Sequence, residues 1–233
     1  MSRKILIGDI HGCLATFKAL LEQINIHRET DKLFLLGDYV DRGPDSKGVI
    51  DEIISLQQAG YAVLPIRGNH EQMLIADHHA ETVKGWHDMA DEELKKSFGI
   101  ENLSQLPMEY INFCKALPYY HSEDDFIAVH AGLDFSQKDP LAENKELLWI
   151  RDWYDKVNYD WLQGRKIIHG HTPLTRQEIE EQFSGFDERQ ILNIDCGVYL
   201  SKSKIHGLGH LCAFDITNKR LFFQENIEKD CKY

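Results

Sequence analysis

The chain has 233 residues, of which 42% are hydrophobic and 10% aromatic, and its formal net charge at pH 7 is −12. This length suits one large domain or two small ones, and the apolar fraction is typical of a folded protein. The acidic balance argues against a protein that coats nucleic acids, because such a protein needs a basic face against the phosphate backbone.

The first 66 residues alternate between apolar runs and helical patterns. Short apolar runs predict buried strands over residues 4–7, 33–36 and 62–66. Apolar residues at helical spacing predict helices over 14–24 and 46–56. Strands that are apolar throughout and alternate with helices are typical of a parallel sheet that is covered on both faces.

A polar stretch follows, over about residues 77–118, and its pattern is helical and rich in charge. We expect a helical insertion here that forms a wall or lid beside the functional site. The second half is rich in strand patterns, with a hairpin turn at Asn218 and Lys219. These strands are expected over residues 126–129, 166–168, 191–194, 211–214 and 221–224. The simplest architecture is a single α/β domain over 1–233, in which two packed sheets are flanked by helices.

Polar side chains follow several of these apolar runs in a recurring way. The strings are GDIHG at 8–12, GDYVDRG at 37–43, RGNHE at 67–71, VHAG at 129–132 and HGHT at 169–172. They supply carboxylate, imidazole and amide groups, which are ligands for metal ions. Because ligands gather at the carboxyl ends of the strands in an open α/β sheet, we expect these side chains to form one metal site.

The ligand types predict a centre with two divalent metal ions. The expected ligands are Asp9 and His11 on one ion, Asn69, His130 and His171 on the other, and Asp38 shared between the two. Ions about 3.5–4 Å apart hold a bridging hydroxide and clamp the oxygens of an in-line phosphoryl displacement. Mixed oxygen and nitrogen ligands without thiolate suit manganese, iron or zinc, and manganese is the metal that we expect. Bound dications also make a phosphorylated substrate compatible with an acidic chain.

A possible acid and several phosphate contacts lie in the same strings. His70 is the candidate general acid that protonates the leaving oxygen, and Asp41 is the natural carboxylate to orient its ring. Arg42 and Arg67 lie in the same loops, and Arg151 in LLWIRDW adds a third guanidinium. Planar guanidinium groups suit the paired oxygens of a phosphoryl group and the charge of its transition state.

Taken in order, the strings GDIHG, GDYVDRG, GNHE, HAG and HGHT resemble the phosphoprotein phosphatase family of metallophosphoesterases, most closely its small bacterial and phage members. The resemblance extends from about residue 4 to about residue 198. It implies an α/β/β/α sandwich with a two-metal site at the mouth of the central sheets. It also implies the ligand and acid roles given above, with Arg151 resting on a looser local match.

The resemblance implies a dimetal phosphatase that hydrolyses phosphomonoesters. Members with an aspartate at the position of Asp41 look more like protein phosphatases, so we expect phosphoserine or phosphothreonine on a protein or peptide as the substrate. The alternative is a symmetrical hydrolase of dinucleoside polyphosphates, a group in the same family that tends to lack this aspartate. A third hypothesis is an inactive module that binds phosphoproteins, and the complete ligand set with His70 argues against it.

The cysteines and the N-terminal segment bear on the compartment. Five cysteines at irregular spacing, without a CxxC pair, predict free thiols in a reducing environment. The apolar run 5–7 is too short for a signal peptide, and no stretch approaches the roughly 20 apolar residues of a membrane span. We therefore expect a cytoplasmic protein with neither a membrane nor a nucleic acid as its partner.

Two polar residues near the motifs have a less direct role. His169 is expected to point away from His171 on a strand-like segment, which favours a structural or outer-sphere role. Asp195 follows the expected strand 191–194, and it either orients a metal-bound histidine or serves as a turn residue.

Overall fold

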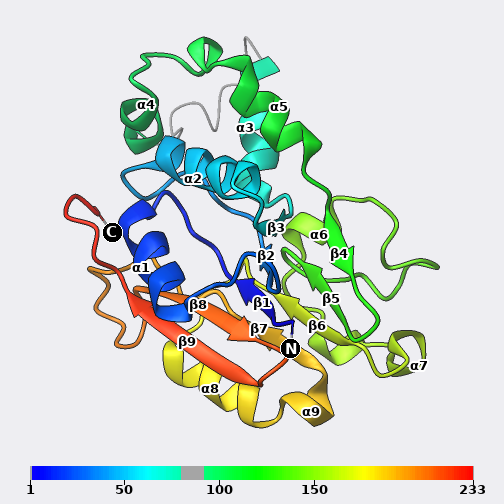
Figure 1. Cartoon of the computed structure of the whole chain (residues 1–233). Helices are drawn as coiled ribbons and strands as arrows, with labels where there is room; N and C mark the ends of the chain where they lie inside the picture. The colour runs from blue at the N-terminus through cyan, green and yellow to red at the C-terminus, as the bar shows by residue number, and fades with distance from the viewer. Residues whose placement is uncertain (1, 80–91, 233) are drawn as a thin grey trace.

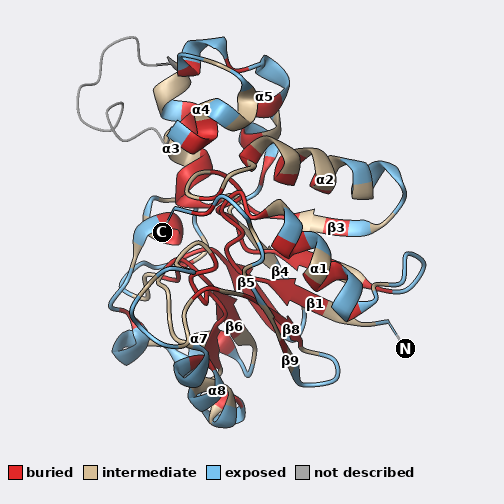
Figure 2. Cartoon of the chain, turned by 90° about the vertical axis from the view of Figure 1, so that its left-hand side faces the viewer, coloured by how far each residue is buried: buried red, intermediate tan, exposed pale blue. Residues whose placement is uncertain are grey.

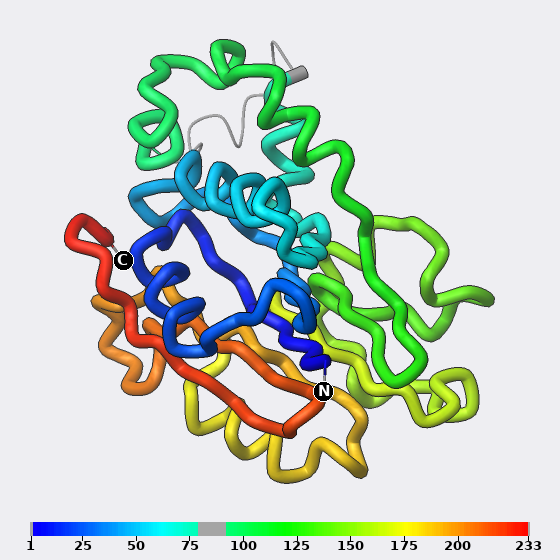
Figure 3. Tube along the Cα trace, in the orientation of Figure 1, coloured from blue at the N-terminus to red at the C-terminus, as the bar shows by residue number. Residues whose placement is uncertain are grey.

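The computed structural model describes residues 2–79 and 92–232. Two β-sheets lie face to face at its centre, one of five strands and one of four. Helices and loops cover the outer faces of the sheets, which gives the α/β/β/α layering expected from the sequence (Figure 1, Figure 3). Among the helices of the two described segments, none has the length and apolar character that a membrane span needs.

The five-stranded sheet has the order β3-β2-β1-β8-β9. Its strands are β1 (Lys4–Ile7), β2 (Lys32–Leu35), β3 (Ala62–Pro65), β8 (His210–Asp215) and β9 (Arg220–Glu225). The first three run parallel, as the alternation of strands and helices predicts. The last two form an antiparallel hairpin, and β8 pairs antiparallel with β1, so the C-terminal strands extend the N-terminal sheet.

The four-stranded sheet has the order β4-β5-β6-β7. Its strands are β4 (Tyr120–Ser122), β5 (Phe126–Val129), β6 (Lys166–His169) and β7 (Ile191–Asn193). β5, β6 and β7 run parallel, and β4 pairs antiparallel with β5 at the edge. The sequence did not predict β4, because its three residues are at most half-buried and show no apolar run.

Successive strand residues point to opposite faces, and this divides the core into layers. The outer face of the first sheet packs, through residues such as Ile5, against two helices. These helices are α1 (Leu14–Ile24) and α2 (Ser46–Gln58). Between the sheets, Phe34 meets Phe126, and on the outer face of the second sheet Ile127 packs in a cluster with Trp153. Central strands such as β1 and β5 are accordingly buried, while the helices expose one side (Figure 2).

A helical segment projects beyond α2 (Figure 1). It comprises α3 (Asn69–His79), α4 (Glu92–Phe98), a 3-10 turn (Leu103–Gln105) and α5 (Met108–Ala116). A hydrogen bond of 2.8 Å from the backbone N–H of Lys47 to Oγ of Ser97 joins α2 to α4. The expected insertion over 77–118 is helical where it is described, with α3 beginning earlier, at Asn69. Residues 80–91 of this insertion lie outside the described residues.

Short helices fill the loops around the second sheet. They are α6 (Glu146–Trp149), a 3-10 turn (Tyr154–Lys156), α7 (Tyr159–Leu162), α8 (Arg176–Ser184) and α9 (Phe186–Arg189). The start of α8 is fixed by a capping box, in which the side chains of Thr175 and Glu178 each accept a hydrogen bond from the other's backbone N–H.

The cysteines agree with the sequence-based prediction of free thiols. All five are buried, and none forms a disulfide. Burial raises the pKa of Cys13 well above its usual value, so this thiol near the first motif stays protonated. Cys13 is therefore a small packing residue in this structure.

Candidate active site

The motifs meet at the carboxyl ends of parallel strands from both sheets. The loops after β1, β2 and β3 come from the first sheet, and the loops after β5 and β6 come from the second. Backbone hydrogen bonds tie these loops together. His11 donates its N–H to the Asp38 carbonyl at 2.8 Å, and Gly170 donates to the His130 carbonyl at 2.8 Å. The sheet edge therefore gathers side chains that are far apart in the sequence.

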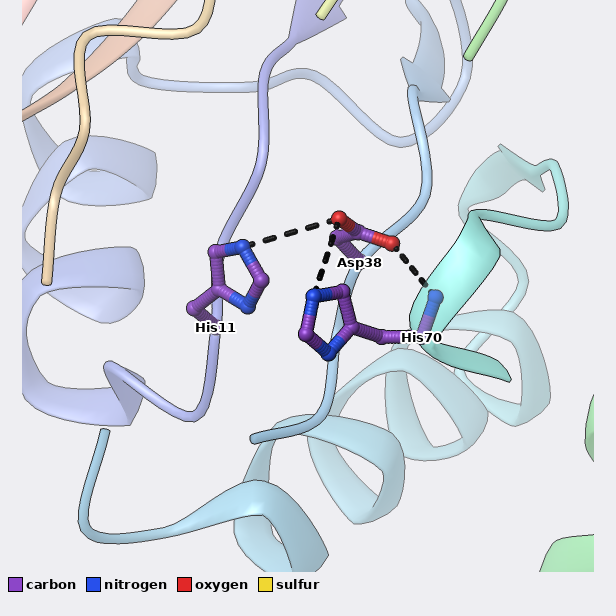
Figure 4. A group of neighbouring side chains, drawn as sticks. All are labelled: His11, Asp38 and His70. Atoms are coloured by element: carbon purple, nitrogen blue, oxygen red, sulfur yellow. Dashed lines mark hydrogen bonds and ion pairs between the residues drawn. The ribbon is translucent and has the colours of Figure 1, made fainter. Parts of the chain in front are cut away.

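The Asp38 carboxylate lies at the centre of this site. Its Oδ2 is 3.5 Å from Nε2 of His11, 3.5 Å from Nε2 of His130 and 3.9 Å from Nε2 of His70. Figure 4 shows His11 and His70 turned toward the same carboxylate. Because Oδ2 lies near histidines that follow strands of both sheets, Asp38 has the position that a shared metal ligand needs.

Hydrogen bonds decide which ring nitrogen of two histidines carries the proton. Nδ1 of His11 is 3.0 Å from the Val40 carbonyl oxygen, and Nδ1 of His130 is 2.8 Å from that of Leu36. A carbonyl only accepts, so Nδ1 carries the proton and Nε2 presents a lone pair to Asp38. Burial lowers the pKa of His11 to about 4 and also lowers that of His130, which keeps both rings neutral. Lone pairs that converge on a carboxylate in this way fit a bound cation.

Asn69 adds an amide oxygen from the first residue of α3. Its Oδ1 is 2.8 Å from Nε2 of His130 and 2.9 Å from Nδ1 of His171. Since Nε2 of His130 has no proton to donate, the first of these contacts joins two acceptors. Within the described residues, Nε2 of His171 is buried without a hydrogen-bond partner. A cation placed between these atoms would turn their repulsion into coordination.

Two groups of buried side chains could each hold a metal ion. The groups are His11, Asp38 and His70, and Asp38, His130 and His171. In each group, the ligand atoms lie within 4.8 Å of one another. The donors are nitrogen and oxygen without thiolate, which suits manganese, iron or zinc. The residues therefore fit a centre with two metal ions that share Asp38, although the first group contains His70 and lacks the expected Asp9.

Asp9 lies beside these groups. Its carboxylate oxygens accept a hydrogen bond from the backbone N–H of His171, at 3.1 and 3.3 Å. A Cβ on Gly170 would lie only 2.0 Å from Oδ1 of Asp9, so this close approach of the loop needs glycine. Burial raises the pKa of Asp9, and the charges of Asp195 and Asp38 raise it further. A neighbouring cation would oppose this rise.

Several site residues have a left-handed backbone conformation. Their φ angles are 44° at His11, 51° at Asp38, 69° at Asp41, 72° at Arg42 and 74° at His171. This conformation costs a non-glycine residue on the order of 1–3 kcal/mol, and such residues cluster at functional sites. Asp9 and His11 lie in the loop after β1, which ends at Ile7.

His70 lies beside the Asp38 carboxylate and is held from the other side by Asp41. Its Nδ1 donates to Oδ2 of Asp41 at 2.6 Å, and its backbone N–H donates to Oδ1 of Asp38 at 3.0 Å. Burial alone would lower the pKa of His70, but the Asp38 charge and the hydrogen bond to Asp41 outweigh it and raise the pKa to about 9. The hydrogen bond to Asp41 thus places a proton on Nδ1 and favours the charged ring, the form that a general acid needs.

Two of the three expected arginines lie at the edge of the site. The guanidinium carbon of half-buried Arg42 is 5.5 Å from the centre of the Tyr199 ring. Exposed Arg151 donates from Nη1 to Oγ1 of Thr172, at 2.9 Å, and Thr172 directly follows His171. Burial and, to a smaller extent, nearby positive charge that includes Arg151 lower the pKa of His171 to about 3. Both arginines are thus placed where an anion at the site could meet them.

Arg67 is directed toward the helical segment instead. Its Nη2 donates to the carbonyl oxygens of Lys115 at 2.7 Å and Leu117 at 3.2 Å, near the end of α5. Its Nη1 donates to the side-chain oxygen of Gln72 at 2.9 Å. The guanidinium therefore ties the RGNHE loop to the helical segment, and a phosphate contact would require these hydrogen bonds to be exchanged.

Sequence reasoning assigned no role to Glu71, the last residue of RGNHE. Its buried carboxylate accepts hydrogen bonds from four backbone N–H groups. The donors are Asp38 at 2.9 Å, Gly68 at 2.9 Å, Tyr39 at 2.8 Å and Val40 at 3.3 Å. Glu71 thus joins the loop after β2 to the loop after β3 and fixes the backbone that carries Asp38. The acidic residue inside the motif is the available signal, but three of its four partners lie more than 30 positions away in the sequence.

Replacing Glu71 by Gln should lower the free energy of unfolding by about 2–4 kcal/mol. The amide would turn an NH2 group toward some of the backbone donors and leave them unsatisfied. Chemical denaturation followed by circular dichroism measures this change. The matched control, Glu92→Gln on the surface of α4, should change the value by less than about 0.5 kcal/mol. A Glu71→Gln protein as stable as that control would contradict the anchoring role.

His169 and Asp195 lie in different surroundings. Nε2 of His169 accepts a hydrogen bond from the Tyr154 hydroxyl at 2.7 Å, and its ring centre is 5.3 Å from that of Trp153. Oδ1 of Asp195 accepts a hydrogen bond from the Gly197 backbone N–H at 2.9 Å, as in a turn. Burial raises the pKa of Asp195 to about 7. His169 therefore belongs to an aromatic cluster, and Asp195 supports the turn after β7.

A family profile described as calcineurin-like phosphoesterase matches residues 3–199. The chain belongs to this family. The matched range contains every motif of the site, so the resemblance to metallophosphoesterases is confirmed at the level of the family. As a calcineurin-like phosphoesterase, the chain also has the sandwich of two sheets and outer helices that the resemblance implied.

Several proteins of known name are similar to this calcineurin-like chain. The symmetrical bis(5′-nucleosyl)-tetraphosphatase of Nitrosomonas europaea is 34% identical over 185 residues, which cover 71% of this chain and 65% of that protein. The one of Pectobacterium carotovorum is 36% identical over 142 residues, which cover 59% of this chain and 46% of that protein. The asymmetrical bis(5′-nucleosyl)-tetraphosphatase PrpE of Anoxybacillus flavithermus is 30% identical over 200 residues, which cover 72% of this chain and 78% of that protein. The chain thus matches only part of the length of its symmetrical relatives.

Solved structures share the fold. A serine/threonine phosphatase from Saccharomyces cerevisiae, similar to human phosphatase PP5, has a TM-score of 0.69 at 18% identity, covering 97% of this chain and 81% of that chain. A metallophosphoesterase from Sphaerobacter thermophilus has a TM-score of 0.58 at 16% identity, and the match covers 98% of this chain and 89% of that chain. At these identities the similarity shows the fold alone.

Proposed function

We propose that this chain is a metal-dependent phosphoesterase that hydrolyses dinucleoside polyphosphates. One observation above all supports the reaction class: Oδ2 of Asp38 faces Nε2 of His11 and Nε2 of His130, each at 3.5 Å. The substrate is supported by the relatives, which are named as symmetrical and asymmetrical bis(5′-nucleosyl)-tetraphosphatases. This choice of substrate differs from the sequence-based expectation, in which phosphoserine or phosphothreonine is the main substrate and dinucleoside polyphosphates are the alternative.

Two divalent ions, with manganese as the expected metal, would be held by nitrogen and oxygen donors. The proposed ligands are Asp9, His11, Asp38, Asn69, His130 and His171. When bound, the ions supply Lewis-acid stabilisation of the phosphoryl oxygens. All the proposed ligands are buried, so their charges and dipoles act in a medium of low dielectric constant, where they stabilise a transition state more strongly than in water.

His70 would give a proton to the oxygen that leaves phosphorus, while Asp41 orients the ring. Arg42 and Arg151 would contact the phosphate oxygens from the edge of the site. A nucleoside diphosphate leaves as a stabilised anion, whereas serine or threonine leaves as a strongly basic alkoxide that depends more on an acid. The 2.6 Å contact between His70 and Asp41 therefore keeps phosphoserine and phosphothreonine as the second candidate substrates.

Parallel turnover on two substrates tests this proposal. The manganese-loaded protein is given diadenosine tetraphosphate in one assay and a phosphothreonine peptide in the other. A higher kcat/KM on the nucleotide supports the proposal, and chromatography then shows whether cleavage is symmetrical, giving ADP, or asymmetrical, giving ATP and AMP. A higher kcat/KM on the peptide would support the second candidate. Hydrolysis of neither would favour a module that only binds phosphoproteins.

A further inference from the structure

A cavity of about 460 Å³ adjoins the proposed metal site. Ala131 and Thr172 line it, and these residues directly follow the proposed ligands His130 and His171. Arg151 also lines it and donates to the Thr172 hydroxyl, so the cavity and the metal site share a rim. Cavities that bind small molecules measure about 300–1,000 Å³, so this one can hold part of a nucleotide.

The ring of Tyr154 forms a rigid aromatic surface in this cavity. Nδ1 of His169 lies 3.0 Å from the Gly170 carbonyl oxygen and so carries the proton. Nε2 of His169 therefore accepts from the Tyr154 hydroxyl at 2.7 Å, and the Gln182 side chain is hydrogen-bonded to the same hydroxyl. Tyr154 remains 41% exposed although its hydroxyl is fixed. A fixed, accessible aromatic ring is the kind of surface on which a nucleobase stacks.

Charged groups surround this aromatic surface. Asp152 and Asp155 line the cavity and are exposed. Within the described part of the chain, neither carboxylate has a hydrogen-bond or ion-pair partner. Carboxylates accept hydrogen bonds from ribose hydroxyls and from the amino groups of bases, whereas they repel phosphate. Arg151, at the rim that faces the metal site, provides the opposite charge.

We infer that this cavity binds one nucleoside of a dinucleoside polyphosphate. The base stacks on Tyr154, Asp152 and Asp155 accept hydrogen bonds from the sugar or base, and the phosphates pass Arg151 toward the metal site. The cavity thus offers an aromatic ring for the base, carboxylates for the sugar or base, and a guanidinium for the phosphates. This inference rests on the proposed function and adds the place where the nucleoside binds.

Steady-state kinetics give the first test. The ratio of kcat/KM on diadenosine tetraphosphate to kcat/KM on p-nitrophenyl phosphate should fall about tenfold in Tyr154→Ala, mainly through KM. It should fall in the same direction in Asp155→Asn, which changes an exposed side chain and should fold normally. Tyr159→Ala removes a tyrosine that is 50% exposed and does not line the cavity, and it should keep the wild-type ratio. An unchanged ratio in both cavity variants overturns the inference.

Binding of adenosine gives a second test that does not depend on turnover. Adenosine has no phosphate, so calorimetry on the manganese-loaded full chain reports the nucleoside site alone. We expect a Kd of about 1 mM or tighter, raised about tenfold in Tyr154→Ala and Asp155→Asn but unchanged in Tyr159→Ala. Absence of adenosine binding to the wild-type protein would overturn the inference even if it hydrolyses diadenosine tetraphosphate. Adenosine binding that depends on these residues, in a protein that hydrolyses only the peptide, would refute the proposed substrate and leave the nucleoside site supported.

Discussion

Replacing His70 by Asn should lower kcat about 10²- to 10⁴-fold, with a metal content near that of the wild-type protein. Asn retains a polar side chain of similar reach but cannot give a proton. In the structure, Nδ1 of His70 donates to Asp41 at 2.6 Å, and this hydrogen bond favours the charged ring, the form that gives a proton. The measurement is kcat on diadenosine tetraphosphate together with metal analysis by mass spectrometry.

Metal content matters in this experiment because Nε2 of His70 is 3.9 Å from Oδ2 of Asp38, in one of the two groups that could hold an ion. A large loss of manganese in His70→Asn would make His70 a ligand and would contradict its role as the acid. A dependence on the leaving group adds a second criterion. The loss of kcat should be smaller on p-nitrophenyl phosphate than on phenyl phosphate, since the better leaving group needs less help from an acid. Exposed His206→Asn is the matched control and should keep wild-type turnover.

Local sequence patterns predicted most of the strands, and the candidate ligands that they singled out lie together in the structure. The apolar run expected at 126–129 has the same bounds as β5, and the run expected at 33–36 is β2, shifted by one residue. Both strands are buried on both faces, so they appear in the sequence as continuous apolar runs. Such runs can be recognised without knowledge of long-range contacts. The gathering of polar residues could be foreseen for the same reason, since parallel strands place their carboxyl ends at one edge.

Other features depend on contacts that a single sequence does not reveal. Glu71 and Arg67 both lie in RGNHE, yet the first binds backbone groups of the neighbouring loop and the second binds carbonyl groups near the end of α5. Arg67 was expected to contact phosphate because its residue type and loop suit an anion. The choice between phosphate and carbonyl oxygen depends on the path of the helical segment, and no local pattern encodes that path. The left-handed backbone at Asp38 is a conformation that aspartate tolerates better than most residues, but this tolerance alone does not specify where it occurs.

Replacing Asp38 by Asn should remove activity together with bound metal. Loss of an outer-sphere partner costs a metal site roughly 10–100-fold in affinity, and loss of a shared ligand should cost at least as much for each ion. Oδ2 of Asp38 faces Nε2 of His11 and Nε2 of His130 at 3.5 Å, so the change affects both proposed ions at once. We expect kcat to fall by roughly 10³-fold or more, because Lewis-acid stabilisation is worth several kcal/mol.

Thermal unfolding distinguishes this loss of metal from a simple loss of structure. A ligand that binds only the folded state raises Tm, so added manganese should raise Tm of the wild-type protein and of Asp187→Asn, a control at an exposed ion pair. In Asp38→Asn the same addition should leave Tm nearly unchanged, while the circular dichroism spectrum of the variant should match that of the wild-type protein. Full manganese occupancy and a normal rise in Tm in Asp38→Asn would show that the ions do not depend on this carboxylate. The convergence of lone pairs from His11 and His130 on Asp38 would then need an explanation other than metal binding.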